Sequence, residues 1–509
     1  MEDDEIIRRS FDESTVVEFE RRVESQAEFL KDEIQTGSLD SSDFTVGLEI
    51  EVYGVKDDGS LVRVPDEVFE VESVSKELGL HNAEINSSPV VLSDEGLRRQ
   101  EDEVRHVLEE ARTASDTNIV LDSVWTLPPD EGSKKYLDDV DERGSYVYAR
   151  NMRVDPRYHA IDNYYLAKSG KASLDVPGAS HDFETILYES LATSLQPHLQ
   201  IPDVDELAPY YNTAIRTMPA VLALTTNSPF LPPDLYNDVD DPESVVDETP
   251  HELRIPIFEQ SVNPGDEYDD KKVRVPRDID TPDDVVDRVT EDCLYAPVLK
   301  EWFEENEEED EEEYTDSFWE FDYRRGTYWR WLRAVIGGER VDENNDEKSV
   351  RIEYRPVPTQ PTVEEIVGVQ AVVSGLIIGL VREDHPVSRL DWKKTRDDFY
   401  SVVDEGLDAN IGWIDEDGNE TRDKEVIYDE VFEYAERGLT SEGVEKSTAE
   451  KYLEPLRRRW ETRLTPSVWK KRKVREGLKD GLSLDASVRR MQSEYIRLGR
   501  EGKRLDDFA

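Results

Sequence analysis

The stretch FTVGLEIEVYGV, residues 44–55, carries the pattern on which the fold depends. Apolar side chains at every second position from Phe44 to Val52 alternate with a second set that includes Gly47, Glu49 and Glu51. A period of two is typical of a strand with one buried face. The stretch therefore predicts a strand whose other face carries two carboxylates, two residues apart.

Composition weakens any argument from these two acids alone. The chain has 119 Asp and Glu in 509 residues, so roughly two dozen acid-x-acid triplets are expected by chance. The net charge is −57, yet 37% of the residues are apolar and nine are Trp, which indicates a folded chain. Acid spread over nearly every segment predicts adaptation to molar salt. The same charge disfavours duplex nucleic acid as a partner.

Three further features bear on the compartment. Cys293 is the only cysteine; it excludes an intramolecular disulfide framework, and its apolar surroundings predict packing. No charged-then-apolar leader opens the sequence. The longest apolar run, 367–381, is interrupted by Gly and Gln and is too short to span a bilayer. Thr362 and Glu365 precede this run with capping-box spacing, which predicts a buried helix. We expect a cytoplasmic protein without a membrane partner.

The chain divides into three expected parts. Residues 1–40 contain an amphipathic helix, residues 41–395 mix strands and helices, and residues 396–509 are helical. Irregular alternation of strands and helices favours an α+β fold with a mainly antiparallel sheet over a doubly wound fold. Helices are predicted at 16–34, 95–114 and 206–227. Two segments are interpreted as insertions: a polar loop at 238–249 and an acidic insert near 303–316, for which a solvated loop is favoured over a divalent-ion site.

The last sixty or so residues are net basic and include RRRW and KKRKVR. Three interpretations are favoured over nucleic-acid binding. The segment packs against the acidic body, packs against a second subunit in a homo-oligomer, or lines the approach for an anionic nucleotide.

Three other stretches repeat the pattern of the first. NAEINSSP (82–89), SLQPHLQIP (194–202) and SVRIEYRPVP (349–358) each alternate an apolar face with a face of potential ligands. If the four strands were neighbours in one sheet, they would gather Glu49, Glu51, Glu84, His198 and Glu353.

Such a cluster of like charges is stable only with cations, and oxygen ligands with one imidazole suit Mg²⁺ or Mn²⁺. Arg351 and Arg355 would stand among the acids, and arginine is suited to phosphate. Together these residues would form a nucleoside-triphosphate site without a glycine-rich loop. Each residue also has an ordinary alternative, such as a solvent-facing acid, a hydrogen-bonded histidine or a surface charge ladder.

Five segments in this order resemble the bacterial and archaeal glutamate–cysteine ligases of the second type: VGLEIEV, AEINSSP, MPAVLALTTNSPF, GTYWRWLRAV and VRIEYRPVPTQPT. The resemblance covers about residues 41–385. It implies a glutamine-synthetase-like catalytic fold, in which helices flank an antiparallel sheet with a polar concave face. The C-terminal segment and the acidic insert lie outside it.

The resemblance also implies roles for individual residues. Glu77 is a weaker candidate ligand beside the metal set. Gln196 and Arg355 would contact the nucleotide or an acyl phosphate. Family members commonly have histidine where this chain has Gln196, a departure that could alter the site. The metal ligands implied are Glu49, Glu51, Glu84, His198 and Glu353, and the catalytic arginines are Arg330, Arg333, Arg351 and Arg355.

The activity implied is ATP-dependent ligation of a carboxylate to an amine, with Mg²⁺ or Mn²⁺. Glutamate and an amine such as cysteine would react through an acyl phosphate to form a γ-glutamyl amide, a step of glutathione-type thiol biosynthesis. Two alternatives stay open. The protein could be a non-catalytic member that binds a nucleotide or a partner, or a metal-dependent amide hydrolase.

Overall fold

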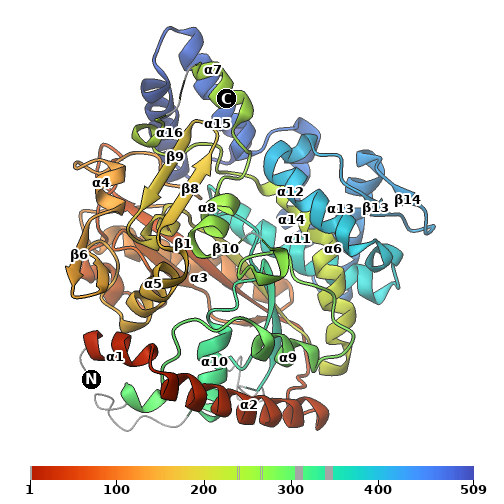
Figure 1. The fold of residues 1–509 in the computed structure, drawn as a ribbon. Coiled ribbons are helices and arrows are strands. Elements are labelled where there is room, and N and C mark those ends of the chain that lie inside the picture. Colours follow the sequence, from red (N-terminus) through yellow and green to blue (C-terminus); the bar gives the residue numbers. More distant parts are fainter. Residues whose placement is uncertain are drawn as a thin grey trace.

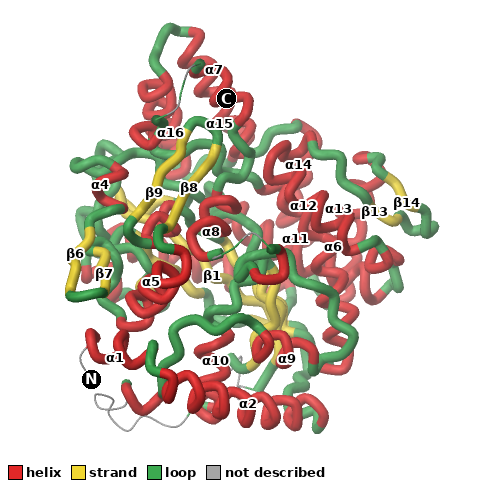
Figure 2. The backbone as a smooth tube through the Cα atoms, in the orientation of Figure 1, coloured by secondary structure: helices red, strands yellow, loops and turns green. Residues whose placement is uncertain are grey.

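The computed structural model describes residues 3–237, 239, 241–263, 265, 267–303, 313–338 and 348–508. Most of the acidic insert predicted near 303–316 lies outside these residues. In Figures 1 and 2 the sheet lies inside the molecule and helices surround it. The first helices run along one end, and the last helices form a projection at the opposite end.

An eight-stranded antiparallel sheet forms the centre of the fold, as the alternating stretches predicted. Its strands lie in the order β11–β12–β10–β1–β3–β2, and the short strands β4 and β5 also pair with β1. The bounds are β1 Thr45–Val55, β2 Val74–Lys76, β3 Asn82–Asn86, β4 Val90–Val91, β5 Asn118–Val120, β10 Leu195–Gln200, β11 Leu332–Ile336 and β12 Val350–Tyr354.

Three separate hairpins and a set of helices surround this sheet. The hairpins are β6 Val140–Arg143 with β7 Tyr146–Ala149, β8 Ala172–Val176 with β9 Ala179–Phe183, and β13 Trp413–Ile414 with β14 Glu420–Thr421. The helices are α1 Asp3–Ser10, α2 Glu13–Gln35, α3 Asp94–Thr113, α4 Ser133–Leu137, α5 Pro156–Ser169, α6 Leu207–Thr225, α7 Pro242–Glu248, α8 Arg254–Val262, α9 Asp284–Glu291, α10 Trp319–Arg325, α11 Val363–Arg382, α12 Trp392–Glu405, α13 Lys424–Ser441, α14 Lys446–Thr462, α15 Pro466–Lys479 and α16 Leu484–Arg500.

Helix α11 is the buried helix predicted from the apolar run. By length and composition it could cross a membrane, but 94% of its apolar window is buried inside the protein. Thr362 caps its start by accepting a hydrogen bond from the Glu365 amide. The apolar run contains Gly375 because α13 crosses there: a Cβ on Gly375 would lie 2.4 Å from the carbonyl oxygen of Ala435 in α13. Gln370 donates to the carbonyl of His198 at 3.2 Å and ties α11 to β10.

The segment 238–249, predicted as a polar loop, contains helix α7. Val245 and Val246 on this helix are buried in a small apolar cluster with Trp469 of α15 and Val488 of α16. The acids that flank these two valines give the segment the composition of a polar loop. This short apolar pair is enough to hold a seven-residue helix against the C-terminal helices.

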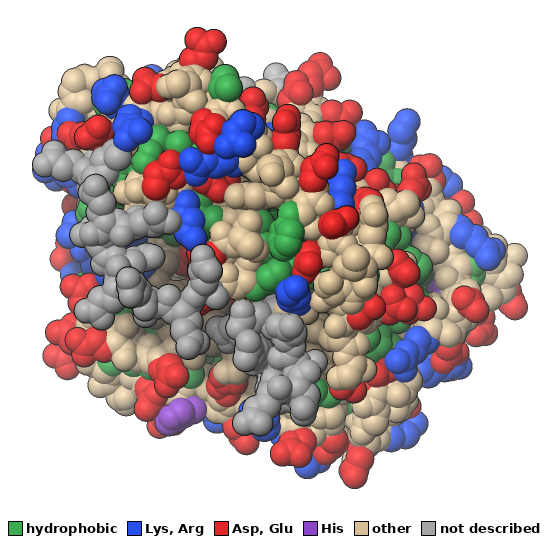
Figure 3. Space-filling view, turned by 90° about the horizontal axis from the view of Figure 1, so that it is seen from below, with side chains coloured by type: hydrophobic (Ala, Val, Ile, Leu, Met, Phe, Trp, Pro, Cys, Tyr) green, Lys and Arg blue, Asp and Glu red, His purple; other side chains and the backbone are tan. Residues whose placement is uncertain are grey.

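The basic C-terminal segment packs against the body of the protein. Lys470 of α15 forms a buried ion pair of 2.5 Å with Asp122, and Arg459 of α14 pairs with Glu365 at 2.9 Å. Arg475 of α15 also contacts Asp247 of α7, at 2.7 Å. Figure 3 shows acidic side chains spread over another face of the molecule, with basic side chains scattered among them.

Candidate functional site

The register of the sheet brings the predicted ligands onto one face. Residues directly opposite each other in antiparallel strands point to the same side. Glu49 of β1 lies opposite Gln196 of β10, and Glu51 lies opposite Glu84 of β3. The row continues across β10 and β12, where His198 lies opposite Glu353 and Glu353 lies opposite Arg333 of β11. The apolar alternate residues of each strand face the core.

Glu49, His198 and Glu353 form a first group of potential metal ligands. One ligand atom from each lies within 4.8 Å of the others. His198 Nε2 lies 3.3 Å from Glu49 Oε1, and this buried nitrogen has no hydrogen-bond partner in the described chain. An imidazole nitrogen grouped with two carboxylates and left without a hydrogen bond fits a cation once that nitrogen carries no proton. Burial lowers the pKa of His198, which favours the neutral imidazole that a metal requires.

Arg351 restrains this histidine. Its Nε donates to His198 Nδ1 at 3.0 Å. A neutral imidazole that accepts at Nδ1 carries its own proton on Nε2. Ligation of a metal through Nε2 therefore requires the proton to move to Nδ1 and Arg351 to release this contact. Arg351 also donates to the carbonyl of Gly337.

Glu51, Glu77 and Glu84 form a second group, again with ligand atoms within 4.8 Å of one another. Glu51 is oriented by the Ser194 amide at 2.6 Å and by Gln196 at 3.2 Å. Burial, followed by the charges of Glu51 and Glu49, raises the pKa of Glu77 to about 7. Burial and the nearby Glu49, Glu77 and Glu51 raise the pKa of Glu84 well above its ordinary value. Three carboxylates this close need either protons or a cation.

Two arginines neutralise Glu353. Arg333 binds both of its carboxylate oxygens, and Arg355 donates to Oε1 at 2.6 Å. Arg355 also donates to Gln196 at 2.5 Å. Burial alone would raise the pKa of Glu353, but the charges of Arg333 and Arg355 hold it well below its ordinary value. Glu353 is thus ionised without a metal, whereas Glu77 and Glu84 of the second group hold their protons to higher pH.

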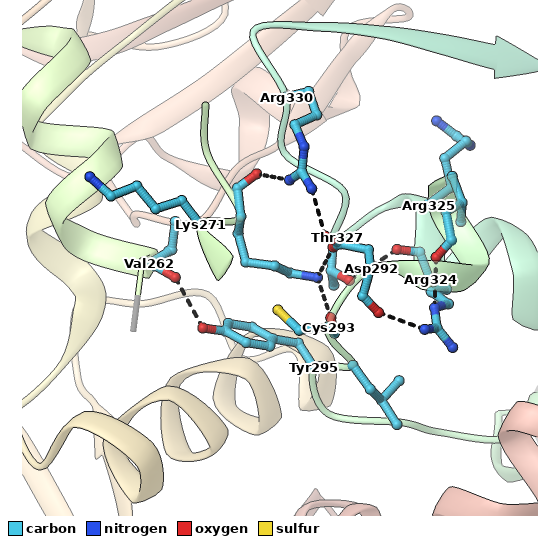
Figure 4. Close-up of polar contacts among 12 residues, drawn as sticks. Val262, Lys271, Asp292, Cys293, Tyr295, Arg324, Arg325, Thr327 and Arg330 are labelled. Carbon is cyan, nitrogen blue, oxygen red and sulfur yellow. Dashed lines mark hydrogen bonds and ion pairs between the residues drawn. The ribbon is translucent and has the colours of Figure 1, made fainter. Parts of the chain in front are cut away.

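Arg330 lies apart from the other predicted arginines. It is buried, its NH2 group donates to Asp292 at 2.6 Å, and its NH1 group donates to the Lys272 carbonyl (Figure 4). Asp292 also pairs with Lys272 at 2.5 Å, and Arg330 lines neither cavity described below. The tertiary fold thus separates Arg330 from Arg333, although only two residues lie between them in the sequence. Cys293, beside this cluster in Figure 4, is partly buried against the core, as expected.

Two cavities meet at the polar face. The larger, 620 Å³, is lined by Gly47, Glu49, His198 and Arg351 among others. The smaller cavity, 230 Å³, is lined by Glu49 and Glu51 of β1 and by Glu77, Glu84, Gln196, Arg333 and Arg355. Glu49 lines both cavities. The ligand groups therefore lie where a molecule in one cavity can approach a molecule in the other.

Sequence reasoning missed several residues of the smaller cavity. Glu189 lies in the 3₁₀ turn Ile186–Leu191, and burial with the charges of Glu51 and Glu77 raises its pKa to about 8. Arg157 and Tyr158 of α5 and Trp329 also line this cavity. None of these residues belongs to a strand with alternating ligands, so the period-two signal could not find them. Glu77 was predicted as a weaker candidate ligand. In the structure it offers a ligand atom to the second group just as Glu51 and Glu84 do.

Comparison with known proteins identifies the family. The model for glutamate–cysteine ligase family 2 (GCS2) matches residues 45–498. This match includes most of the C-terminal segment, which the motifs had placed outside the resemblance, and helices α15 and α16 pack onto the body. No curated protein sequence matches the chain.

Two solved structures share the fold. A glutamate–cysteine ligase from Francisella tularensis in complex with AMP is 14% identical, with a TM-score of 0.50, over 92% of this chain and 93% of that one. A bifunctional glutathione synthetase from Pasteurella multocida is 13% identical, with a TM-score of 0.52, over 90% of this chain and 53% of that one. At these identities the likeness concerns the fold alone. The family match over most of the sequence shows that this chain belongs to glutamate–cysteine ligase family 2.

Proposed function

We propose that this protein is an ATP-dependent ligase that joins the γ-carboxylate of glutamate to an amine such as that of cysteine. The observation that carries the proposal is the position of Glu49, which lines both cavities and belongs to one of two adjacent groups of metal ligands. Phosphoryl transfer between two bound molecules needs such a boundary, with cations and arginines placed where charge develops. Membership of a ligase family supports the same reaction.

We assign the nucleotide to the larger cavity and glutamate and the amine to the smaller one. Mg²⁺ or Mn²⁺ at the two ligand groups would neutralise phosphate charge. Arg351 lines the larger cavity, and a nucleotide phosphate there would draw it away from His198. The same movement would free His198 for the ligating tautomer. Glu189 lines the smaller cavity outside both ligand groups, and we assign it to the amine.

The reaction would proceed in two steps. A carboxylate oxygen of glutamate attacks the γ-phosphorus of ATP, the bond to the bridging oxygen breaks, and ADP leaves. Arg333 and Arg355 are held by Glu353 at the wall of the smaller cavity, where they would stabilise charge on the transferred group. The amine then attacks the acyl carbon and inorganic phosphate leaves. No covalent bond to the protein is needed.

The test is ADP release by purified protein in high salt with Mg²⁺, glutamate and a panel of amines. We expect release that requires both glutamate and an amine, and that is lost in Glu49→Gln. Glu95→Gln, an exposed acid at the start of α3, is the matched control and should keep full activity.

Each alternative has its own outcome in this assay. Amide cleavage without ATP would favour the metal-dependent hydrolase. ATP binding without ADP release for any amine would favour a non-catalytic member. Steady ADP release without any amine would show an uncoupled ATPase, and the ligase proposal would fail.

A further inference from the structure

A third cavity, of 420 Å³, shares no lining residue with the two catalytic cavities. It lies where the end of α3, the start of α11 and the end of α16 meet, and these elements contribute Arg112, Val363 and Arg500. None of the predicted site residues reaches it. It is therefore a cavity distinct from the two to which we assign the ligation substrates.

Two arginines that line this cavity, Arg112 and Arg500, have no carboxylate partner in the part of the chain that the structure describes. Arg112 is partly buried, and its Nε donates to the Ile119 carbonyl at 3.1 Å. Among the described residues, neither Arg112 nor Arg500 forms an ion pair with an acid. Burial and the charge of Arg500 lower the pKa of Arg112 to about 10, in keeping with the closeness of the two cations.

The acids around the cavity are mostly engaged elsewhere. Glu364 is bound by Arg504 at 3.2 Å, and Glu501 is bound by Arg497 at 2.7 Å. Glu109 adds a favourable charge to Arg112 but makes no ion pair with it in the described chain. Two neighbouring arginines without an acidic partner among the described residues are unusual in a protein with 119 acidic and 62 basic residues.

A partly buried cation without a counter-ion is costly, and two neighbouring cations repel each other. An anion between them removes both penalties, and the guanidinium fork matches phosphate and carboxylate oxygens. Leu108, Leu121 and Val363 line other parts of the cavity and can contact a hydrocarbon portion. We propose that this cavity binds a small molecule with at least two negative charges, carried by phosphate or carboxylate groups, between Arg112 and Arg500.

Calorimetric titration with inorganic pyrophosphate and with citrate, in Mg²⁺-free buffer at fixed ionic strength, tests the proposal. We expect at least one of the two probes to bind, and the one that binds tells phosphate from carboxylate chemistry. Arg112→Met and Arg500→Met should each weaken binding by about tenfold or more. Arg489 lies on α16, like Arg500, but pairs with Asp485. The Arg489→Met variant is therefore the matched control and should bind the probe as the wild type does.

Arg500 is exposed, so its substitution tests the cavity even if Arg112→Met fails to fold. Absence of binding by both probes would overturn the proposal. An equal loss in Arg489→Met would do so too, because it would show that affinity depends on the overall charge of the protein and not on contacts in the cavity. Binding that survives both cavity variants but disappears in Arg351→Met would place the anion in the catalytic cavity instead.

Discussion

Glu49 and Glu51 lie two residues apart on β1, yet they belong to two different groups of potential metal ligands. Glu49 joins His198 and Glu353, and Glu51 joins Glu77 and Glu84. Residues i and i+2 of a strand are about 7 Å apart along one face. A single strand therefore carries one carboxylate into each of two adjacent sites, and a cation in each could touch the same chain of phosphates.

The first prediction concerns metal stoichiometry. We expect the wild-type protein to bind two Mn²⁺ ions and Glu84→Gln to bind one, because only the second group loses a ligand. Equilibrium dialysis or the electron paramagnetic resonance signal of free Mn²⁺ measures the number bound. Glu95→Gln is the control and should keep both ions. Loss of both ions in Glu84→Gln would show that the two groups act as one site.

The second prediction concerns pH. Metal ligation requires Glu77 to be ionised, and its pKa is about 7 in the metal-free protein. Affinity for Mn²⁺ should therefore rise by about tenfold between pH 6 and pH 8. The stability of the metal-free protein should change in the opposite direction. Folded Glu77 keeps its proton up to about pH 7, whereas unfolded Glu77 loses it near pH 4.5, so the contribution of Glu77 to the free energy of unfolding falls as the pH rises from 4.5 to 7. Titrations at several pH values check both trends, and Glu77→Gln should weaken them, while Glu84 still titrates.

The third prediction separates two neighbouring arginines. Arg333→Met should lower amine-dependent ADP formation by about a hundredfold or more, because Arg333 lies at the cavity wall beside Glu353. Arg330→Met should instead lower the free energy of unfolding by about 3 kcal/mol, since it breaks a buried pair with Asp292. Turnover and chemical denaturation of both variants give the comparison. A folded Arg330→Met protein with the same loss of activity would contradict this division of roles.

The fourth prediction concerns the attachment of the C-terminal helices. Lys470→Met should destabilise the protein by about 3–5 kcal/mol, because it leaves Asp122 buried without its ion-pair partner. Asp122→Asn should also destabilise it. The double variant should lose less than the sum of the two single losses, by about 1–3 kcal/mol, if the two residues interact directly. Additive losses in denaturant titrations would argue against the buried pair.

The fifth prediction concerns salt. A chain with a net charge of −57 repels itself in dilute buffer, and salt screens this repulsion. The melting temperature should therefore rise steadily between about 0.1 M and 3 M KCl. Sucrose at matched water activity is the control, because it adds no screening charge. A melting temperature that does not change with KCl would remove the case for adaptation to high salt.

The sequence by itself determined the strands and their faces. Alternation in 44–55, 82–89, 194–202 and 349–358 predicted four strands with one polar side, and all four are in the sheet. This succeeded because side-chain direction in a strand depends only on the local period of two. The buried helix α11 was likewise predicted from its apolar run and its Thr362 cap.

Tertiary structure decided which ligands share a site. Only the pairing of β1 with both β3 and β10 places Glu51 beside Glu84 and Glu49 near His198. It also recruited Glu77 and Glu189 from outside the alternating strands, and it directed Arg330 toward Asp292 rather than toward the cavity. Strand order and loop paths depend on contacts between residues far apart in the chain, and no local pattern encodes which distant segment becomes the neighbour.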